Sequence, residues 1–119
     1  MSLAEIAPEP DYDLEEDPFT LTNLRPRCTG LPMTVYVGFG GGAKYDARVK
    51  VSVVHDDRID LNDVAIVSIR PEPKLLHGQL SRSDLEQVRR WVELNRAALL
   101  DHWEERTDGM DLIEALKPL

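Results

Sequence analysis

The chain has 119 residues and a formal net charge of −8 at pH 7, a length that suits one domain able to bury a core without disulfides or metal. Its single cysteine excludes an intrachain disulfide. Its apolar runs fall far short of the roughly 18 to 20 residues needed to cross a bilayer, and its start lacks the features of a secretory signal. We therefore expect a cytoplasmic protein with no membrane segment.

The negative charge is concentrated in the first part of the chain. Residues 1–24 contain seven acidic and no basic side chains, whereas residues 25–119 contain 15 acidic and 14 basic ones. Few apolar residues accompany the early acids, a composition typical of disorder. We expect residues 1–17 to form a disordered acidic arm and residues 18–119 to form one domain. The arm either only aids solubility or docks on a basic surface of this protein or of a partner.

The first predicted strands include a hairpin. Residues 19–24 alternate apolar with polar positions, which favours a short extended piece on a sheet edge. Residues 33–39 and 46–53 alternate in the same way and predict two half-buried strands. Because glycines occupy positions 40–42 between them, the simplest connection is an antiparallel hairpin with a flexible turn.

Two cations lie on the second strand of this hairpin. Arg48 and Lys50 alternate with the apolar positions, so the pattern predicts that both face water. Farther along, residues 64–70 form a nearly continuous apolar run, which predicts a third strand covered on both faces. Pro71 and Pro73 end this strand because neither can donate to a sheet ladder.

The last third of the chain predicts a long helix. Ser81 as N-cap and Asp84 three residues later resemble a capping box. Apolar residues then recur at helical spacing, so we expect a helix over residues 81–106 with its apolar face on the sheet, and a short one over residues 110–117. The predicted fold is α+β, with a small, mostly antiparallel sheet of three or four strands covered on one face by the long helix and the short terminal helix.

Polar side chains fall on or beside the buried face of the long helix. Trp91, Asn95 and His102 line one edge of its apolar stripe, and Arg96 lies beside them. Since a buried polar group without a partner costs about 1 to 3 kcal/mol, each needs a designated partner. These groups either tie the helix to backbone carbonyls or loop carboxylates, or rim a ligand or partner groove between helix and sheet.

A second candidate surface is basic and clusters in sequence near the hairpin. It comprises Arg25, Arg27, Lys44, Arg48 and Lys50. Such a surface could contact phosphates, and neighbouring tyrosines could stack on bases. The acidic arm would compete for the same surface, which disfavours nucleic acid as the partner.

No segment has a catalytic or cofactor motif with the spacing that its chemistry needs. Residues 38–44 are rich in glycine, but a phosphate-binding loop would need Gly at Ala43 and Ser or Thr at Tyr45. His55 and the aspartates after it match neither an EF-hand nor a His-x-x-x-His pair, and nothing near Cys28 marks a nucleophile. We therefore expect no cofactor, no metal site and no catalytic residue.

One pattern spans the long helix and the end of the chain. It reads Trp-hydrophobic-x-x-(His or Asn)-Arg-x-x-Leu-hydrophobic-x-x-Trp, with a closing Pro-Leu: Trp91, Val92, Asn95, Arg96, Leu99, Leu100, Trp103, Pro118 and Leu119. It resembles the ending of a family of small uncharacterised bacterial α+β proteins with a domain of unknown function, and the resemblance covers about residues 80–119. Members usually also have a Pro-Pro-His-x-His loop, which this chain lacks, so no activity of that loop carries over. Such proteins are often encoded beside a small partner gene, as toxin–antitoxin pairs are, which implies a role in protein interaction.

Three function classes follow from the sequence. The first is a non-enzymatic interaction protein or small regulatory adaptor that binds another protein or a second copy of itself. The second is a small-molecule binder or small enzyme that uses a helix–sheet cleft, with His55 or Asp57 across from the helix edge. The third is a nucleic-acid binder that uses the basic hairpin face. The acidic arm on a nearly neutral domain, without a catalytic constellation, favours the first.

Overall fold

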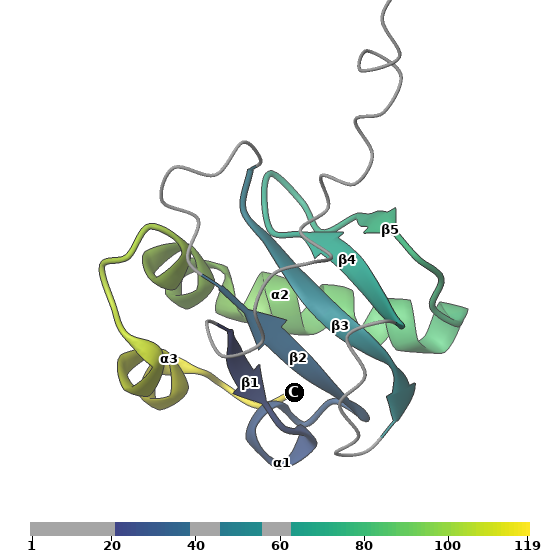
Figure 1. Ribbon diagram of the computed structural model, residues 1–119, viewed down its shortest axis with the longest axis horizontal. Helices are drawn as coiled ribbons and strands as arrows, with labels where there is room; N and C mark the ends of the chain where they lie inside the picture. Colours follow the sequence, from purple (N-terminus) through teal and green to yellow (C-terminus); the bar gives the residue numbers. More distant parts are fainter. Residues whose placement is uncertain (1–20, 39–45, 56–62) are drawn as a thin grey trace, which may run out of the picture.

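The computed structural model describes residues 21–38, 46–55 and 63–119. In this part of the chain, one antiparallel sheet has the order β1-β2-β3-β4-β5, with β1 Thr22–Leu24, β2 Met33–Val37, β3 Arg48–His55, β4 Val64–Ser68 and β5 Leu75–His77. The helices are α1 Pro26–Thr29, α2 Arg82–Trp103 and α3 Gly109–Ala115. Figure 1 shows α2 behind the sheet and α3 near β1. The expected arm and the glycine-rich turn lie outside the described residues.

The α+β class and the antiparallel hairpin are confirmed, but the predicted strand count is wrong. The sheet has five strands rather than three or four. Between Pro73 and the long helix, where the sequence predicts no strand, the chain forms β5, in which Leu75 pairs with Val67 and His77 with Ile66. Three residues are too few to show a period, so only the pairing with β4 reveals this strand.

One face of the sheet forms the hydrophobic core with α2. Alternate residues of a strand point to the same face, so the apolar positions of the central strands meet the apolar stripe of the helix. The main contributors are Met33, Val35, Val37, Val49, Val51, Val67, Ile69, Val88, Trp91, Val92 and Leu99. Since each fully buried aliphatic side chain contributes about 1.5 to 3 kcal/mol, this layer supplies most of the stability of the fold.

The long helix begins as the sequence predicts and bends in its middle. Ser81 Oγ accepts a hydrogen bond from the backbone N–H of Asp84 at 3.0 Å. At Asn95 the backbone leaves the helical region, with φ −113° and ψ 16°. The Asn95 Nδ2 donates to the Trp91 carbonyl at 3.0 Å. Insertion of a side chain into the ladder of backbone hydrogen bonds is a known cause of such bends.

The short helices are set by their first residues. Asp108 and Asp111 form a reciprocal capping box at the start of α3, which confirms a short terminal helix. The sequence did not predict α1. Pro26 takes the first position of this helix of four residues, where its missing N–H costs no hydrogen bond.

Gly78, between β5 and α2, provides a test of the fold. Its φ is +81°, and a Cβ there would lie 2.7 Å from the Val64 carbonyl oxygen. We expect Gly78→Ala to lower the free energy of unfolding by about 1 to 3 kcal/mol in urea denaturation, because both the backbone angle and the close approach oppose a side chain. Gly109→Ala is the matched control, since a Cβ there meets only the side chain of Thr22, at 3.2 Å. Equal losses in the two variants would contradict this explanation.

Candidate functional site

The second face of the sheet is rich in polar side chains. The strand register aligns Asn23, Tyr36, Lys50, Ile66 and His77 in one row across all five strands. Arg48 and Ser68 form a neighbouring pair two positions along β3 and β4. Because side chains alternate between faces, all of these point away from the core that α2 covers. We call this set of residues the polar sheet face.

Two cations of this face are almost completely buried. Lys50 is 5% exposed, Arg48 is 6% exposed and Tyr36 is 1% exposed. The prediction that Arg48 and Lys50 face water is therefore wrong, although they do point away from the core. Each of them has an interaction partner. A buried cation costs several kcal/mol unless anions or hydrogen-bond acceptors compensate it, so this face demands negative or strongly polar partners.

The strands themselves supply no negative charge. None of β1 to β5 contains an acidic residue. At the end of the sheet, just before β3, Asp46 Oδ1 accepts from Arg70 Nε at 2.7 Å. The N–H of Ala47 and then Arg70 hold the pKa of Asp46 below its ordinary value. Arg48 also interacts with Asp46: its charge lowers the pKa of Asp46 further, and its Nε donates to the Asp46 carbonyl at 3.3 Å.

The basic residues predicted as one surface lie in different places. Arg48 and Lys50 share the polar sheet face. Arg25 and Arg27 belong to the start of α1, just before β2 begins. Since β2 and β3 are antiparallel, this is the opposite end of the sheet from Arg48, which begins β3. Lys44 lies outside the described residues.

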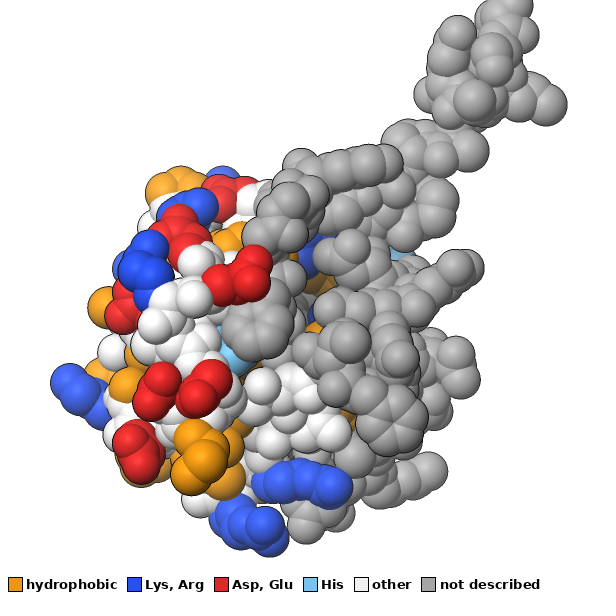
Figure 2. Space-filling view, turned by 60° about the vertical axis from the view of Figure 1, so that its left-hand side comes forward, with side chains coloured by type: hydrophobic (Ala, Val, Ile, Leu, Met, Phe, Trp, Pro, Cys, Tyr) orange, Lys and Arg blue, Asp and Glu red, His pale blue; other side chains and the backbone are white. Residues whose placement is uncertain are grey.

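The outer side of the helices carries mixed charge. Figure 2 shows acidic and basic side chains interspersed over its described surface, without a continuous basic patch. Some of these are paired, as Arg106 Nη2 is with Asp101 Oδ1 at 2.7 Å and Arg90 Nε with Glu86 Oε2 at 3.3 Å. Exposed pairs of this kind contribute little to stability, but they leave few cations for a polyanion.

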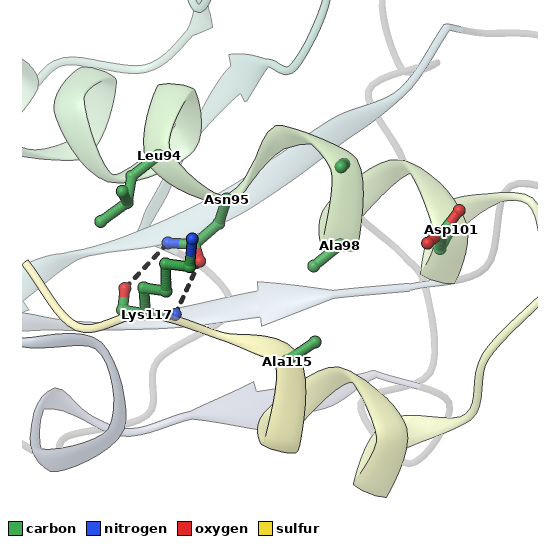
Figure 3. A pocket seen from close by; sticks show the side chains of 7 residues that line it. Leu94, Asn95, Ala98, Asp101, Ala115 and Lys117 are labelled. Atoms are coloured by element: carbon green, nitrogen blue, oxygen red, sulfur yellow. Dashed lines mark hydrogen bonds between the residues drawn. The ribbon is translucent and has the colours of Figure 1, made fainter.

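The helix residues predicted to rim a groove are buried. Trp91 and His102 are 0% exposed and Asn95 is 3% exposed. Asn95 holds the end of the chain: its Nδ2 donates to the Lys117 carbonyl at 3.0 Å, and the Lys117 N–H donates to its Oδ1 at 2.7 Å (Figure 3). Arg96 Nε donates to the Ile69 carbonyl at 2.9 Å. These amide and guanidinium groups therefore tie the helix to backbone, the first of the two roles considered for them.

An open pocket of about 300 Å³ lies beside this tie. It opens between α2, the end of α3 and the segment that follows α3, rather than between helix and sheet. Figure 3 shows Asn95 and Lys117 meeting at one end of it. Trp91 and His102 do not line it. The Asn95 amide is already occupied by backbone, so the pocket offers a ligand mainly alanine and leucine surface with Asp101 at its margin.

His102 joins the end of α2 to the turn before α3. Burial lowers its pKa below the ordinary value, and hydrogen bonds with the backbone at Asp108 and Thr107 act in the opposite direction. The net shift is downward, so the folded protein holds this imidazole neutral near pH 7. A buried, neutral and backbone-bonded ring is a structural group.

The other candidate groups do not assemble into a metal or catalytic site within the described residues. His55 Nε2 lies 2.9 Å from Asp84 Oδ2, which links the end of β3 to the first turn of α2. The aspartates at 56, 57 and 60 lie outside the described residues. Cys28 is partly buried in α1. In the described part of the chain, no group of three or more His, Cys, Asp or Glu side chains could hold a metal ion.

Asn95→Ala tests the tie to the end of the chain. The change removes the helix insertion and both hydrogen bonds to Lys117, and it leaves buried backbone groups without their partner. We expect the free energy of unfolding to fall by about 2 to 4 kcal/mol, together with faster amide exchange at Lys117. Glu93→Ala, on the exposed side of the same helix, is the control. Unchanged exchange at Lys117 would contradict the assignment.

The lowered pKa of His102 predicts that the stability of the fold depends on pH. Below its ordinary pKa of 6.5, the unfolded chain takes up a proton on this ring more readily than the folded protein does. Its contribution to stability is therefore fully present above pH 6.5 and is lost as the pH falls toward 5. Urea midpoints measured at pH 7, 6 and 5 should decrease, and His102→Asn should reduce this slope. An unchanged slope in the variant would assign the effect to other groups.

Comparison with known proteins finds a similarity for one region of the chain. Residues 54–104, from the end of β3 through α2, match the family model of a domain of unknown function (DUF4160). No curated protein and no solved structure matches the chain. Among the described helices, none is both long and apolar enough to span a membrane. The region that contains β4, β5 and the long helix is thus similar to an uncharacterised domain family, as the pattern on that helix indicated.

Proposed function

We propose that the chain is a non-enzymatic interaction protein whose polar sheet face binds an acidic protein segment. The observation that carries this proposal is the placement of Arg48 and Lys50 two residues apart on one face of a sheet whose strands contain no acidic residue. Both cations already interact within the chain, so a partner replaces those contacts when it binds. Charge-assisted hydrogen bonds to carboxylates are the strongest compensation that protein groups offer to such cations.

The spacing on this face suits an extended acidic segment. Arg48 and Lys50 are two residues apart on one strand, so their Cα atoms lie about 6.6 Å apart and both side chains point the same way. Carboxylates at alternate positions of an extended peptide have the same spacing. Arg48 can pair with one carboxylate through two parallel hydrogen bonds, while Lys50 meets the next. Tyr36 and His77, in the row of Lys50, add hydrogen-bonding groups.

Nucleic acid fits this face less well. Tight electrostatic binding of a nucleic acid uses on the order of 6 to 10 phosphate contacts, and the polar sheet face offers two buried cations. Arg25 and Arg27 are at the other end of the sheet. The resemblance of the C-terminal third to bacterial proteins encoded beside small partner genes also supports a dedicated protein partner, and a cytoplasmic location agrees with the lone cysteine.

Peptide titration tests this function. The probe is a fluorescent peptide with Asp or Glu at alternate positions. The protein is the full chain with every acidic residue before Leu21 replaced by its amide, so that the arm cannot compete. We expect binding by fluorescence anisotropy that Lys50→Gln weakens at least tenfold and that Lys50→Arg largely retains. Arg27→Gln, which removes an exposed cation of α1, should leave binding unchanged.

Two outcomes would overturn the proposal. One is the absence of peptide binding by a chain whose folding is verified by circular dichroism. The other is tighter binding of a single-stranded oligonucleotide of equal charge, which would assign the face to nucleic acid instead.

A further inference from the structure

We infer that two copies of this chain pack together through the exposed side of α2, with the two helices antiparallel about a two-fold axis. The surface is a row of four residues, Arg90, Leu94, Ala97 and Asp101, which we call the helix stripe. The inference does not rest on the function proposed above, because the polar sheet face lies on the side of the sheet that α2 does not cover (Figure 1).

The helix stripe lies opposite the side of α2 that packs on the sheet. At 3.6 residues per turn, its four members fall within a sector of about 60°, and the core residues of α2 fall on the other side of the helix. Leu94 is 45% exposed. The side chains of Arg90 and Asp101 are 66% and 44% exposed. The stripe is therefore accessible to a second molecule along its whole length.

The stripe continues across the bend in the middle of α2. Leu94 lies just before Asn95, whereas Ala97 and Asp101 lie after it, yet all three line the same open pocket. Figure 3 shows Leu94 and Lys117 at one end of this pocket and Asp101 at the other. Each copy thus offers both an exposed leucine side chain and a hollow lined largely by alanines, into which a leucine side chain can pack.

The spacing of the stripe is the same in both directions. Its members are four, three and four residues apart. A two-fold axis between positions 95 and 96 therefore places Leu94 of one copy against Ala97 of the other, and Arg90 against Asp101. In a symmetric dimer each of these contacts occurs twice. The apolar contacts are central, and a pair of opposite charges lies at each end, about 8 Å along the helix from the axis.

The charges specify both the partner and the direction of the helices. Arg90 pairs with Glu86 at 3.3 Å and Asp101 with Arg106 at 2.7 Å within the chain. These exposed pairs contribute little to stability, so they do not oppose a further partner. In the antiparallel dimer each guanidinium meets a carboxylate of the other copy, whereas parallel helices would bring like charges together. The stripe is thus complementary to itself in one direction only.

This packing leaves the polar sheet faces of both copies on the outside. Because α2 lies between the helix stripe and the sheet, the layers of the dimer follow the order sheet, helix, helix, sheet (Figure 1). Arg48 and Lys50 of the two copies then lie on opposite outer surfaces. The dimer is therefore bivalent toward any partner that these faces bind.

Sedimentation equilibrium of the full chain tests the interface. We expect a reversible equilibrium between monomer and dimer, which Leu94→Gln weakens by about tenfold because a polar side chain replaces leucine at the centre of the contact. Ile113→Gln is the matched control, since Ile113 is also 45% exposed but lies on α3, away from the residues that line the pocket. The control should leave the dissociation constant unchanged. Equal weakening in the two variants would overturn the proposal.

Exchange of charges tests the antiparallel arrangement. Arg90→Glu alone and Asp101→Arg alone each place like charges at both ends of the contact, so each should weaken the dimer by about tenfold. The double variant, and an equimolar mixture of the two single variants, restore opposite charges at both ends and should associate as the original chain does. Arg82→Glu, which makes the same change in charge nearer the start of α2, should have no effect.

Three results would overturn the proposal. A chain that stays monomeric up to about 0.5 mM would exclude a second copy and leave the stripe to a helix of another protein. A dimer that survives both single charge changes would place the interface elsewhere. Failure of the double variant and of the mixture to associate, with folding verified by circular dichroism, would contradict the antiparallel packing. None of these results depends on whether the polar sheet face binds an acidic peptide.

Discussion

The sheet has two faces, but the long helix α2 covers only one of them. This asymmetry determines the rest of the structure. Apolar side chains of β2, β3 and β4 bury one face against α2. The other face is buried as well, with Lys50 only 5% exposed. An apolar face is stabilised by burial against any apolar surface of matching shape. A buried ammonium group also needs a partner of opposite charge or good hydrogen-bond acceptors. The two buried cations, Arg48 and Lys50, therefore lie on the face that α2 does not cover.

On the side of the sheet that α2 covers, the polar side chain of Asn95 has a structural role. Its side chain bonds the Trp91 carbonyl within α2 and both backbone groups of Lys117. Farther along, the Leu119 N–H donates to the Thr29 carbonyl at 2.8 Å, so the end of the chain is fixed to α1 as well. One amide thus sets the bend of the helix and the path of the last residues. The neighbouring pocket lies beside these hydrogen bonds. The Asn95 amide, which lines it, already bonds the backbone of Lys117.

The sequence predicted what depends on local periodicity and missed what depends on distant neighbours. The Ser81 cap, the hairpin strands and the long helix follow from patterns of a few residues. β5 and α1 are three and four residues long, too short for any period to appear. Alternation placed Lys50 on the face away from the core, but it cannot tell whether another segment covers that face. The partner of Asn95 is 22 residues away in sequence, and no local signal marks it.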